Sequence, residues 1–295
     1  MSDPIVVEVR RNGVVEAVHP VHAVAVRGGE VVAAAGDPAH ACFMRSASKP
    51  LQALPLVRSR DDLPDDELAI ACASHRDTPE QVAAVRALLA RAEATDGDLE
   101  LGPQEGRSPQ LIHNNCSGNH AGMLALCRAR GWPTQGYRLS EHPVQQACLE
   151  VHAEAAELGP GQIPTGTDGC GIVTFALTLE RMAHAFSRIE ALDGGRRVAD
   201  AMRSRPELVR GYGAPDTELM RLGVGWIAKG GAEGLLCAAC DGLGIALKVE
   251  DGAQRPLGPA LAVFLGELGL GVGNFATAAV VNSRGEVVGE LRVTA

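Results

Sequence analysis

The chain has 295 residues, of which 46% are hydrophobic, so it is long and apolar enough to bury a full core. Only 3% are aromatic, which leaves alanine, valine and leucine to fill that core. The net charge of −9 and the lack of a basic run argue against a nucleic-acid-binding protein. The N-terminal sequence shows no basic flank followed by an apolar stretch, and no apolar run reaches membrane-spanning length, so we expect a cytoplasmic protein that contacts no membrane.

The first predicted elements are strands within residues 4–35. Asn12-Gly13 stands between two β-branched runs and predicts a tight hairpin. Gly28-Gly29 repeats the same pattern further along.

Residues 46–225 predict mostly helices, separated by loops rich in glycine and proline. The clearest helix is capped by Thr78, with Pro79 at its first position and Gln81 completing a capping box. The short acidic run over residues 61–67 reads as a solvated loop.

Strands return near the end of the sequence, over residues 243–252 and 275–293, with a segment of helical spacing, 258–268, between them. Strands at both ends and helices in the middle predict the α+β class, with one antiparallel sheet built from both chain termini. We predict one unit, residues 1–295, with a sheet part over about 1–45 and 226–295 and a helical part over about 46–225.

Lysine is rare in this chain. Of 27 lysines and arginines only three are lysines, at Lys49, Lys229 and Lys248. Arginine keeps its proton at any working pH, whereas lysine can lose it. A lysine close to a serine therefore indicates proton transfer.

The segment from Ser46 to Lys49 fits S-x-x-K, the nucleophile motif of penicillin-binding proteins and class A β-lactamases. At a helix start both side chains lie on one face, and a neutral lysine amine can take the serine proton. This requires burial or a nearby cation to lower the lysine pKa from about 10.4. The alternative is an ordinary helix start, and Pro50 predicts an irregular first turn.

Two later segments extend this pattern. Ser74-His75 stands in a polar turn between an apolar run and the capped helix, and Lys229 precedes two glycines that let backbone N–H groups approach a substrate. The penicillin-binding group has the same order of serine, lysine, second serine and second lysine. Lys229 would supply the cation that keeps Lys49 neutral. The alternatives are that Ser74 only ends a helix and that Lys229 is a surface charge.

Eight cysteines in a chain of this kind predict reduced thiols, most of them in the core. Cys116 and Cys170 stand in two polar loops that we expect to open buried helices, where a thiolate is stabilised. The two could hold a zinc ion, although the spacing favours two inert thiols. Cys237-x-x-Cys240 lies in an apolar run and predicts helical core packing.

Five motifs follow one another along the chain: RSASKPLQALPLV, ASHRD, HNNCSGNHAG, TDGCG and AKGGAEG. Together they resemble the L-asparaginase II family, the rhizobial, serine-hydrolase-like type of asparaginase, over nearly the whole chain. The resemblance implies a fold similar to serine β-lactamases and glutaminases, usually as a homodimer. It also implies hydrolysis of L-asparagine to L-aspartate and ammonia.

In that family pattern Ser46 and Lys49 match the first catalytic serine and its lysine, and Ser74 and Lys229 match the second pair. The resulting hypothesis is acyl transfer in two steps, in which Ser46 or Ser74 attacks the side-chain amide. Lys49, kept neutral by Lys229, is the base. Backbone N–H groups near Ser46 or Gly230 would stabilise the oxyanion.

The resemblance further implies a zinc ion held by two cysteines and a lysine. Cys116 and Cys170 match the cysteines, but Asn119 stands where the lysine is expected. An amide oxygen is a poor zinc ligand beside thiolates. Zinc is therefore lost, weakly held, or completed by water, His120 or Asp168, and the chemistry itself requires no cofactor.

The expected partner is a small-molecule substrate. Its charged ends and amide are predicted to be bound by Arg45, His75, Asn114, His120, Asp168 and Gly230. Three alternatives stay open: a glutaminase or β-lactam-type serine hydrolase of the same fold, a zinc hydrolase in which the metal activates water, and a catalytically weak or non-catalytic amide-binding protein.

Overall fold

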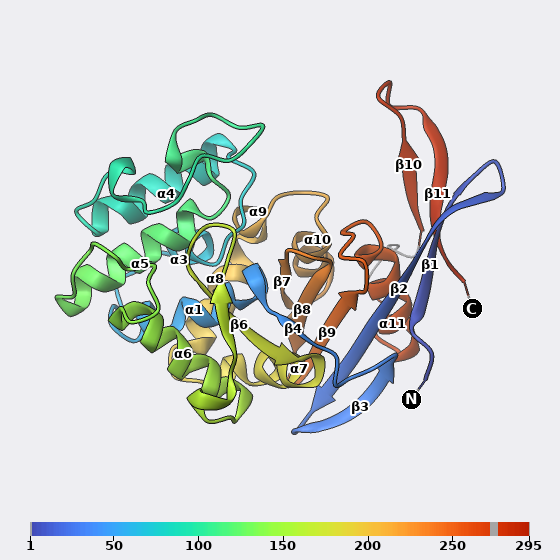
Figure 1. Ribbon diagram of the computed structural model, residues 1–295, viewed down its shortest axis with the longest axis horizontal. Helices are drawn as coiled ribbons and strands as arrows, with labels where there is room; N and C mark the ends of the chain where they lie inside the picture. The colour runs from blue at the N-terminus through green and yellow to red at the C-terminus, as the bar shows by residue number, and fades with distance from the viewer. Residues whose placement is uncertain (1, 272–276, 295) are drawn as a thin grey trace.

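Two antiparallel sheets form the β-structure of the computed structural model, which describes residues 2–271 and 277–294. The strands are β1 Ile5–Arg11, β2 Val14–Arg27, β3 Glu30–Ala35, β4 Ala41–Phe43, β5 Thr165–Thr167, β6 Val173–Thr178, β7 Ile227–Gly231, β8 Leu235–Cys240, β9 Leu243–Val249, β10 Thr277–Val281 and β11 Val287–Thr294. The larger, eight-stranded sheet has the order β10-β11-β1-β2-β9-β8-β7, with β3 paired to β2 (Figure 1). The smaller sheet has the order β4-β6-β5.

Most helices lie between the two parts of the chain that form the large sheet. They are α1 Lys49–Gln52, α2 Leu54–Val57, α3 Asp65–Ala71, α4 Pro79–Arg91, α5 Ser117–Arg130, α6 Pro143–Ala156, α7 Leu179–Arg188, α8 Gly195–Ser204, α9 Pro206–Val209, α10 Pro215–Leu222 and α11 Leu257–Glu267. Helices α1 to α6 gather beyond the β7 edge, whereas α7 packs across β2, β8 and β9 (Figure 1). Within the described ranges, no helix combines the length and the apolarity needed to cross a bilayer.

The prediction that both ends of the chain contribute strands to one antiparallel sheet is confirmed. Strands β1 and β2, from the N-terminus, lie between β11 and β9, from the C-terminal part. Val7 pairs with Val293 on one side and with His19 on the other, all antiparallel. The fold class is therefore α+β with an antiparallel sheet from both termini.

The first hairpin forms where the sequence predicts it. Asn12 and Gly13 have φ values of 46° and 81°, the left-handed conformation that a tight hairpin turn requires and that these two residue types tolerate. Along β1, Val7 and Val9 are fully buried while the residues between them are partly exposed. This alternation places one face of the strand on the core.

Helix α4 begins with the predicted capping box. The backbone N–H of Gln81 donates to the Thr78 hydroxyl at 3.4 Å, and the Thr78 N–H donates to Gln81 Oε1 at 3.2 Å. Both bonds satisfy N–H groups that lack partners inside the helix.

The predicted helix around Cys237 and Cys240 is wrong, because both residues belong to strand β8. The residues from Leu235 to Ala239 are all buried, so both faces of the strand are covered. A strand buried on both faces reads as a continuous apolar run, which periodicity does not separate from a buried helix.

The expectation that Cys170 opens a helix is also wrong. Cys170 lies in a turn that leads into strand β6, and helix α7 begins only at Leu179. Strands β5 and β6 thus interrupt the region predicted as helical. The run IVTFALT after the turn is rich in β-branched residues, which favour a strand.

Gly244 marks the close approach of α7 to β9. A Cβ atom at this position would lie 1.8 Å from the carbonyl oxygen of Ala183. We therefore expect Gly244→Ala to lower the free energy of unfolding by about 2 kcal/mol or more, because the helix backbone must move. Urea unfolding followed by circular dichroism measures this change.

The matched control is Gly266→Ala. Gly266 is exposed on α11 and has no atom within 4 Å of an added Cβ. We expect this substitution to be neutral or to stabilise the protein by up to about 1 kcal/mol. Equal stabilities of the two variants would contradict the close packing of α7 on β9.

Candidate active site

The S-x-x-K segment forms a 3₁₀ turn, Arg45–Ser48, that runs directly into α1. The predicted irregular first turn is this 3₁₀ turn. Lys49 nevertheless has helical angles, φ −58° and ψ −37°, although Pro50 follows it. The turn places Ser46 on a cavity wall and the Lys49 side chain in the interior, 1% exposed.

The backbone just before Ser46 is strained. Arg45 has a φ of 50°, the left-handed region that a residue with a Cβ seldom adopts. Two contacts hold it there: its N–H donates to Thr174 Oγ1 at 3.1 Å, and its Nε donates to Asp168 Oδ1 at 2.7 Å. The predicted polar residues Arg45 and Asp168 therefore form an ion pair that fixes the direction in which Ser46 points.

The Ser74 hydroxyl lies between both predicted catalytic lysines. Lys229 Nζ is 3.0 Å from Ser74 Oγ, and Lys49 Nζ is 3.2 Å from the same oxygen. Ser74 follows α3 in a polar turn, as predicted, and its backbone N–H donates to Val209 O at 2.8 Å. Residues 49, 74 and 229, far apart in the sequence, thus meet at one oxygen atom.

Lys49 has an acceptor for each hydrogen of an ammonium group. Its Nζ lies 2.6 Å from Ala73 O, 3.2 Å from Ser74 Oγ and 3.3 Å from Cys116 Sγ. An ammonium has three N–H donors, and these three contacts match them. Lys229 Nζ has two such acceptors, Ser74 Oγ at 3.0 Å and Gly230 O at 2.7 Å, so Lys49 has the more complete set of the two lysines.

Lys229 lies on β7 with a fully buried side chain. Burial lowers the pKa of Lys229 to about 7, Asp216 opposes this change, and Lys49 and Arg210 add to it. The nearest carboxylate oxygen, Asp216 Oδ2, is 4.0 Å from Nζ, too far for a hydrogen bond. Near neutral pH a large share of Lys229 amines therefore carries no charge.

Two cavities of about 350 Å³ each meet at Ser46. We call the first the Ser74 cavity; its lining residues are Ser46, Ser74, Asn115, Arg210, Gly230, Gly231, Ala232, Glu233, Gly252 and Gln254. We call the second the Arg45 cavity; it shares Ser46, Asn115 and Ala232 with the first and adds Arg45, Asn114, Cys116, Asp168, Cys170 and several residues of the 102–105 loop.

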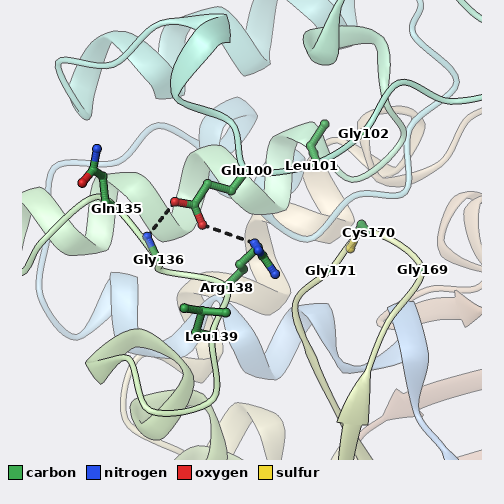
Figure 2. A pocket seen from close by; sticks show the side chains of 10 residues that line it. All are labelled: Glu100, Leu101, Gly102, Gln135, Gly136, Arg138, Leu139, Gly169, Cys170 and Gly171. Carbon is green, nitrogen blue, oxygen red and sulfur yellow. Dashed lines mark hydrogen bonds and ion pairs between the residues drawn. The ribbon is translucent and has the colours of Figure 1, made fainter.

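A third and larger cavity, about 790 Å³, adjoins the Arg45 cavity at Cys170 (Figure 2). The Glu100 carboxylate accepts the Gly136 N–H at 2.6 Å and lies 3.6 Å from Arg138 Nε. Neither serine and neither lysine of the site lines this cavity. The third cavity is therefore larger but is lined by none of the predicted catalytic residues.

His75 and His120 do not line the two cavities at Ser46. His75 Nε2 lies 2.7 Å from Ser117 Oγ, and its Nδ1 accepts the Asp77 N–H at 3.1 Å. His120 Nδ1 lies 2.7 Å from Tyr137 Oη. Burial lowers the pKa of each histidine to about 3, so both are neutral and serve the packing behind the site.

The Gly230 N–H is already engaged, because it donates to Asp216 Oδ2 at 2.8 Å. It is therefore not an oxyanion donor. Among the described residues, the N–H groups of Ser46 and Ala232 have no hydrogen-bond acceptor, and both residues line both cavities. These two N–H groups are the better pair to stabilise a developing oxyanion.

Sequence reasoning missed Arg210, Asp216 and Ala232. Asp216 is fully buried and holds the Gly230 N–H beneath the cavity floor. No local pattern marks Arg210 and Asp216, because their roles depend on tertiary contacts such as those between β7 and α10. Ala232 alone had a signal, since it follows the Lys229 motif by three positions.

The two cysteines of the predicted metal site do meet. The neighbouring Cys170 lowers the pKa of Cys116, while Cys116 and burial raise the pKa of Cys170. The third position does not complete a zinc site: Asn119 Nδ2 donates to Ala71 O at 3.3 Å, and its buried Oδ1 has no partner.

Zinc sites use three or four strong protein ligands. In the part of the chain that the structure describes, no three His, Cys, Asp or Glu side chains are arranged to hold a metal. The Lys49 amine, 3.3 Å from Cys116 Sγ, lies against one of the two thiols. The residues present do not fit a zinc ion, and no step below uses one.

Comparison with known proteins gives a family. The family model described as L-asparaginase II matches residues 7–293. A search of curated proteins finds no significant match.

Several solved structures share the fold. Two crystal structures of Mglu align at 14% identity with a TM-score of 0.50, over 86% of this chain and 62% and 68% of theirs. A protein from Bacteroides dorei DSM 17855 that is assigned as a β-lactamase aligns at 14% identity over 84% of this chain and 94% of its own, with a TM-score of 0.46. These are similarities of fold alone, and this chain spans less than two thirds of the first Mglu chain.

We expect the chain to bind zinc weakly and Asn119→Lys to strengthen binding about 10- to 100-fold, because a lysine amine adds the missing strong ligand. Zinc retained after dialysis, measured by mass spectrometry of the metal, tests this. Cys148→Ser is the control, since Cys148 is buried away from both cavities. Stoichiometric zinc in the unaltered chain, lost in Cys116→Ser, would contradict the expectation.

Proposed function

The chain belongs to the L-asparaginase II family, and on that premise we propose that it hydrolyses L-asparagine to L-aspartate and ammonia. Family membership makes it a hydrolase of small amides. The choice of asparagine as substrate and the serine–lysine mechanism are our proposal. A small-molecule substrate fits the two cavities of about 350 Å³.

The observation that carries the proposal is the position of the Ser74 hydroxyl. It lies 3.0 Å from the Lys229 amine and 3.2 Å from the Lys49 amine, on the wall of a cavity that Ser46 also lines. A hydroxyl becomes a nucleophile when a neutral base within hydrogen-bond reach takes its proton. Structural pairing with carboxylates, the non-catalytic alternative, needs no serine between two lysines.

We assign the neutral base to Lys229 and the cation to Lys49, the reverse of the assignment made from the sequence. The lowered pKa of Lys229 supports its role as the base. The three acceptors around Lys49 Nζ support its role as the cation that favours the developing alkoxide.

The reaction then runs in two steps. Ser74 gives its proton to Lys229, and the serine oxygen attacks the amide carbon while the Ser46 and Ala232 N–H groups stabilise the oxyanion. The C–N bond breaks, ammonia leaves with the proton from Lys229, and an acyl-enzyme remains. Water then gives a proton to Lys229 and attacks the acyl carbon. As the bond to the serine oxygen breaks, Lys229 returns that proton to the serine, which releases aspartate and restores the neutral amine.

Ser46 offers a variant of the same route. In the described part of the chain its hydroxyl donates no hydrogen bond, its N–H has no acceptor, and the residue lines both cavities. In this variant Ser46 attacks, and Ser74 passes the proton to Lys229. Both routes depend on Ser74 and Lys229, and they differ in which serine carries the acyl group.

The proposal includes no metal cofactor, since the chain's own residues and water supply every group in the reaction. From the family resemblance alone we also propose a homodimer. Glutaminase and β-lactam hydrolysis are the alternatives within the same chemistry. Ammonia release from asparagine and from glutamine, together with cleavage of nitrocefin, compares the three substrates directly.

Removal of the proton-transfer pair tests the mechanism. Ser74→Ala and Lys229→Met are each expected to lower kcat/KM for asparagine by about 1000-fold or more, because no base then reaches the hydroxyl. Ammonia release in a coupled assay gives the rate. Trapping of the acyl-enzyme and peptide mapping assigns the nucleophile to Ser74 or Ser46.

Lys248→Met is the matched control. Lys248 is the third lysine of the chain, lies on β9 and lines neither cavity at Ser46. We expect it to keep its activity within a few fold. Lys229→Met retaining the activity of the Lys248 variant would refute the proposed base.

The pH dependence has a definite sign. A base must be neutral to act, so kcat/KM should rise with pH, with a midpoint near the Lys229 pKa of about 7. Well below that pH the neutral fraction falls tenfold per pH unit, and the rate should follow it. A rate that is constant from pH 5.5 to 8, or that falls as pH rises, would be inconsistent with a neutral Lys229.

A further inference from the structure

The Ser74 cavity carries one cation and one carboxylate on its wall besides the serines. Arg210 and Glu233 both line it. Arg210 follows α9, and Glu233 lies in the turn between β7 and β8. Opposite charges in one small cavity suit a ligand that itself carries both charges.

The Arg210 guanidinium has free donor capacity. Its nearest carboxylate contact is Nη1 to Asp216 Oδ2 at 3.7 Å, longer than a hydrogen bond. That oxygen already accepts the Gly230 N–H at 2.8 Å. Within the described ranges the guanidinium donates no hydrogen bond, and its side chain is 25% exposed. The guanidinium is therefore free to donate two parallel hydrogen bonds to an anion in the cavity.

Hydrogen bonds tie the segment that carries Arg210 to the turn that carries Ser74. The residue before it, Val209, accepts the Ser74 N–H at 2.8 Å. The buried Gln81 side chain donates to Arg210 O at 3.2 Å and accepts the Arg76 N–H at 2.8 Å, so it ties the Ser74 turn to the Arg210 segment. This frame fixes the distance between the guanidinium and the reacting hydroxyl.

Strand β7 leaves room for the guanidinium. A Cβ on Gly230 would lie 2.3 Å from Arg210 Nη1 and 3.2 Å from Asp216 Oδ2. Only a glycine lets the guanidinium lie against the strand beside Lys229. Gly230 therefore leaves space for the Arg210 guanidinium. Its own N–H is bound by Asp216.

Glu233 supplies the opposite charge. Its φ of 60° belongs to the tight turn between the strands, and its side chain is 67% exposed. Its Oε1 is 3.8 Å from Arg45 Nη1, a loose contact that leaves the carboxylate open to a ligand. The carboxylate is suited to an ammonium group.

We propose that Arg210 binds the α-carboxylate and Glu233 the α-ammonium of the substrate, so the site selects free α-amino acids with a side-chain amide over simple amides and amides within peptides. This inference rests on the proposed amidohydrolase function and deepens it by assigning the two residues that bind the charged ends of the substrate. Arg210 is a binding residue. Its charge also contributes to the lowered pKa of Lys229, so the kinetic constants below are compared well above pH 7, where Lys229 is mostly neutral.

The test compares three amides that differ by one charged group. L-Asparagine carries both groups, 3-aminopropanamide lacks the carboxylate, and succinamate lacks the ammonium. Arg210→Met should lower kcat/KM about 100-fold for asparagine and succinamate, mainly through KM, and change it less than about threefold for 3-aminopropanamide. Glu233→Gln should affect asparagine and 3-aminopropanamide and spare succinamate.

Two further variants separate binding from structural damage. Arg210→Lys should recover part of the lost activity, because it keeps the positive charge. Arg221→Met is the control, since Arg221 pairs with Glu218 on the surface of α10. Equal losses on all three amides in Arg210→Met, or no loss on asparagine, would overturn the proposed carboxylate contact.

A binding measurement tests the Arg210 contact even if the chain is not a hydrolase. If the unaltered chain hydrolyses none of the three amides, calorimetric titration with L-aspartate still tests the contact. Binding that weakens at least tenfold in Arg210→Met supports it. Binding unchanged by the substitution, or no binding of aspartate to the unaltered chain, overturns it.

Discussion

The buried amine of Lys229 is the feature on which the rest of the site depends. Its side chain is fully buried, and no carboxylate lies within hydrogen-bond distance in the described part of the chain. A charged ammonium is costly in such a place, so the amine tends to lose its proton. Asp216 could have held the charge, but its Oδ2 is turned to the Gly230 N–H and its Oδ1 to the Thr217 N–H. The fold therefore places an amine of lowered pKa within hydrogen-bond distance of the Ser74 hydroxyl.

The sheet topology explains how this arrangement is assembled. Lys229 lies on β7, an end strand of the large sheet that η1 (Arg45–Ser48) and α10 cover, and all five of its residues are buried. The 3₁₀ turn that carries Ser46 therefore packs directly against the strand that carries the base. Ser74 reaches the same point from the end of α3, and backbone bonds to Val209 and Asn115 O hold its turn. Three chain segments are fixed by backbone contacts, so the reacting groups need little rearrangement.

Sequence reasoning captured the parts of the site that local patterns encode. The two serines and two lysines were identified by spacing, order and the rarity of lysine. The structure brings Ser74 together with both lysines. The prediction of one sheet with strands from both chain ends followed from β-branched runs and from the Asn12-Gly13 turn. The cysteine loops were found, although Cys170 precedes a strand rather than a helix.

What the sequence did not reveal depends on tertiary contacts. Strand β8 is buried on both faces, so its apolar run gave no alternation to read. Asp216 gains its role only because α10 lies beside β7, and Arg210 because the segment that leads into α10 lines the same cavity. The distribution of charge between the two lysines also follows from burial and acceptors, which spacing does not encode. The sequence also does not encode that Asp216 binds the Gly230 N–H, which leaves the N–H groups of Ser46 and Ala232 without an acceptor among the described residues.

The rarity of lysine permits a direct measurement of the central claim. Protein labelled with ¹³C at lysine Cε should give three signals, one for each of Lys49, Lys229 and Lys248. The signal that disappears in Lys229→Met belongs to the base. Our account predicts that this signal titrates with a midpoint near 7. A midpoint above about 9, close to that of an ordinary lysine, would contradict it.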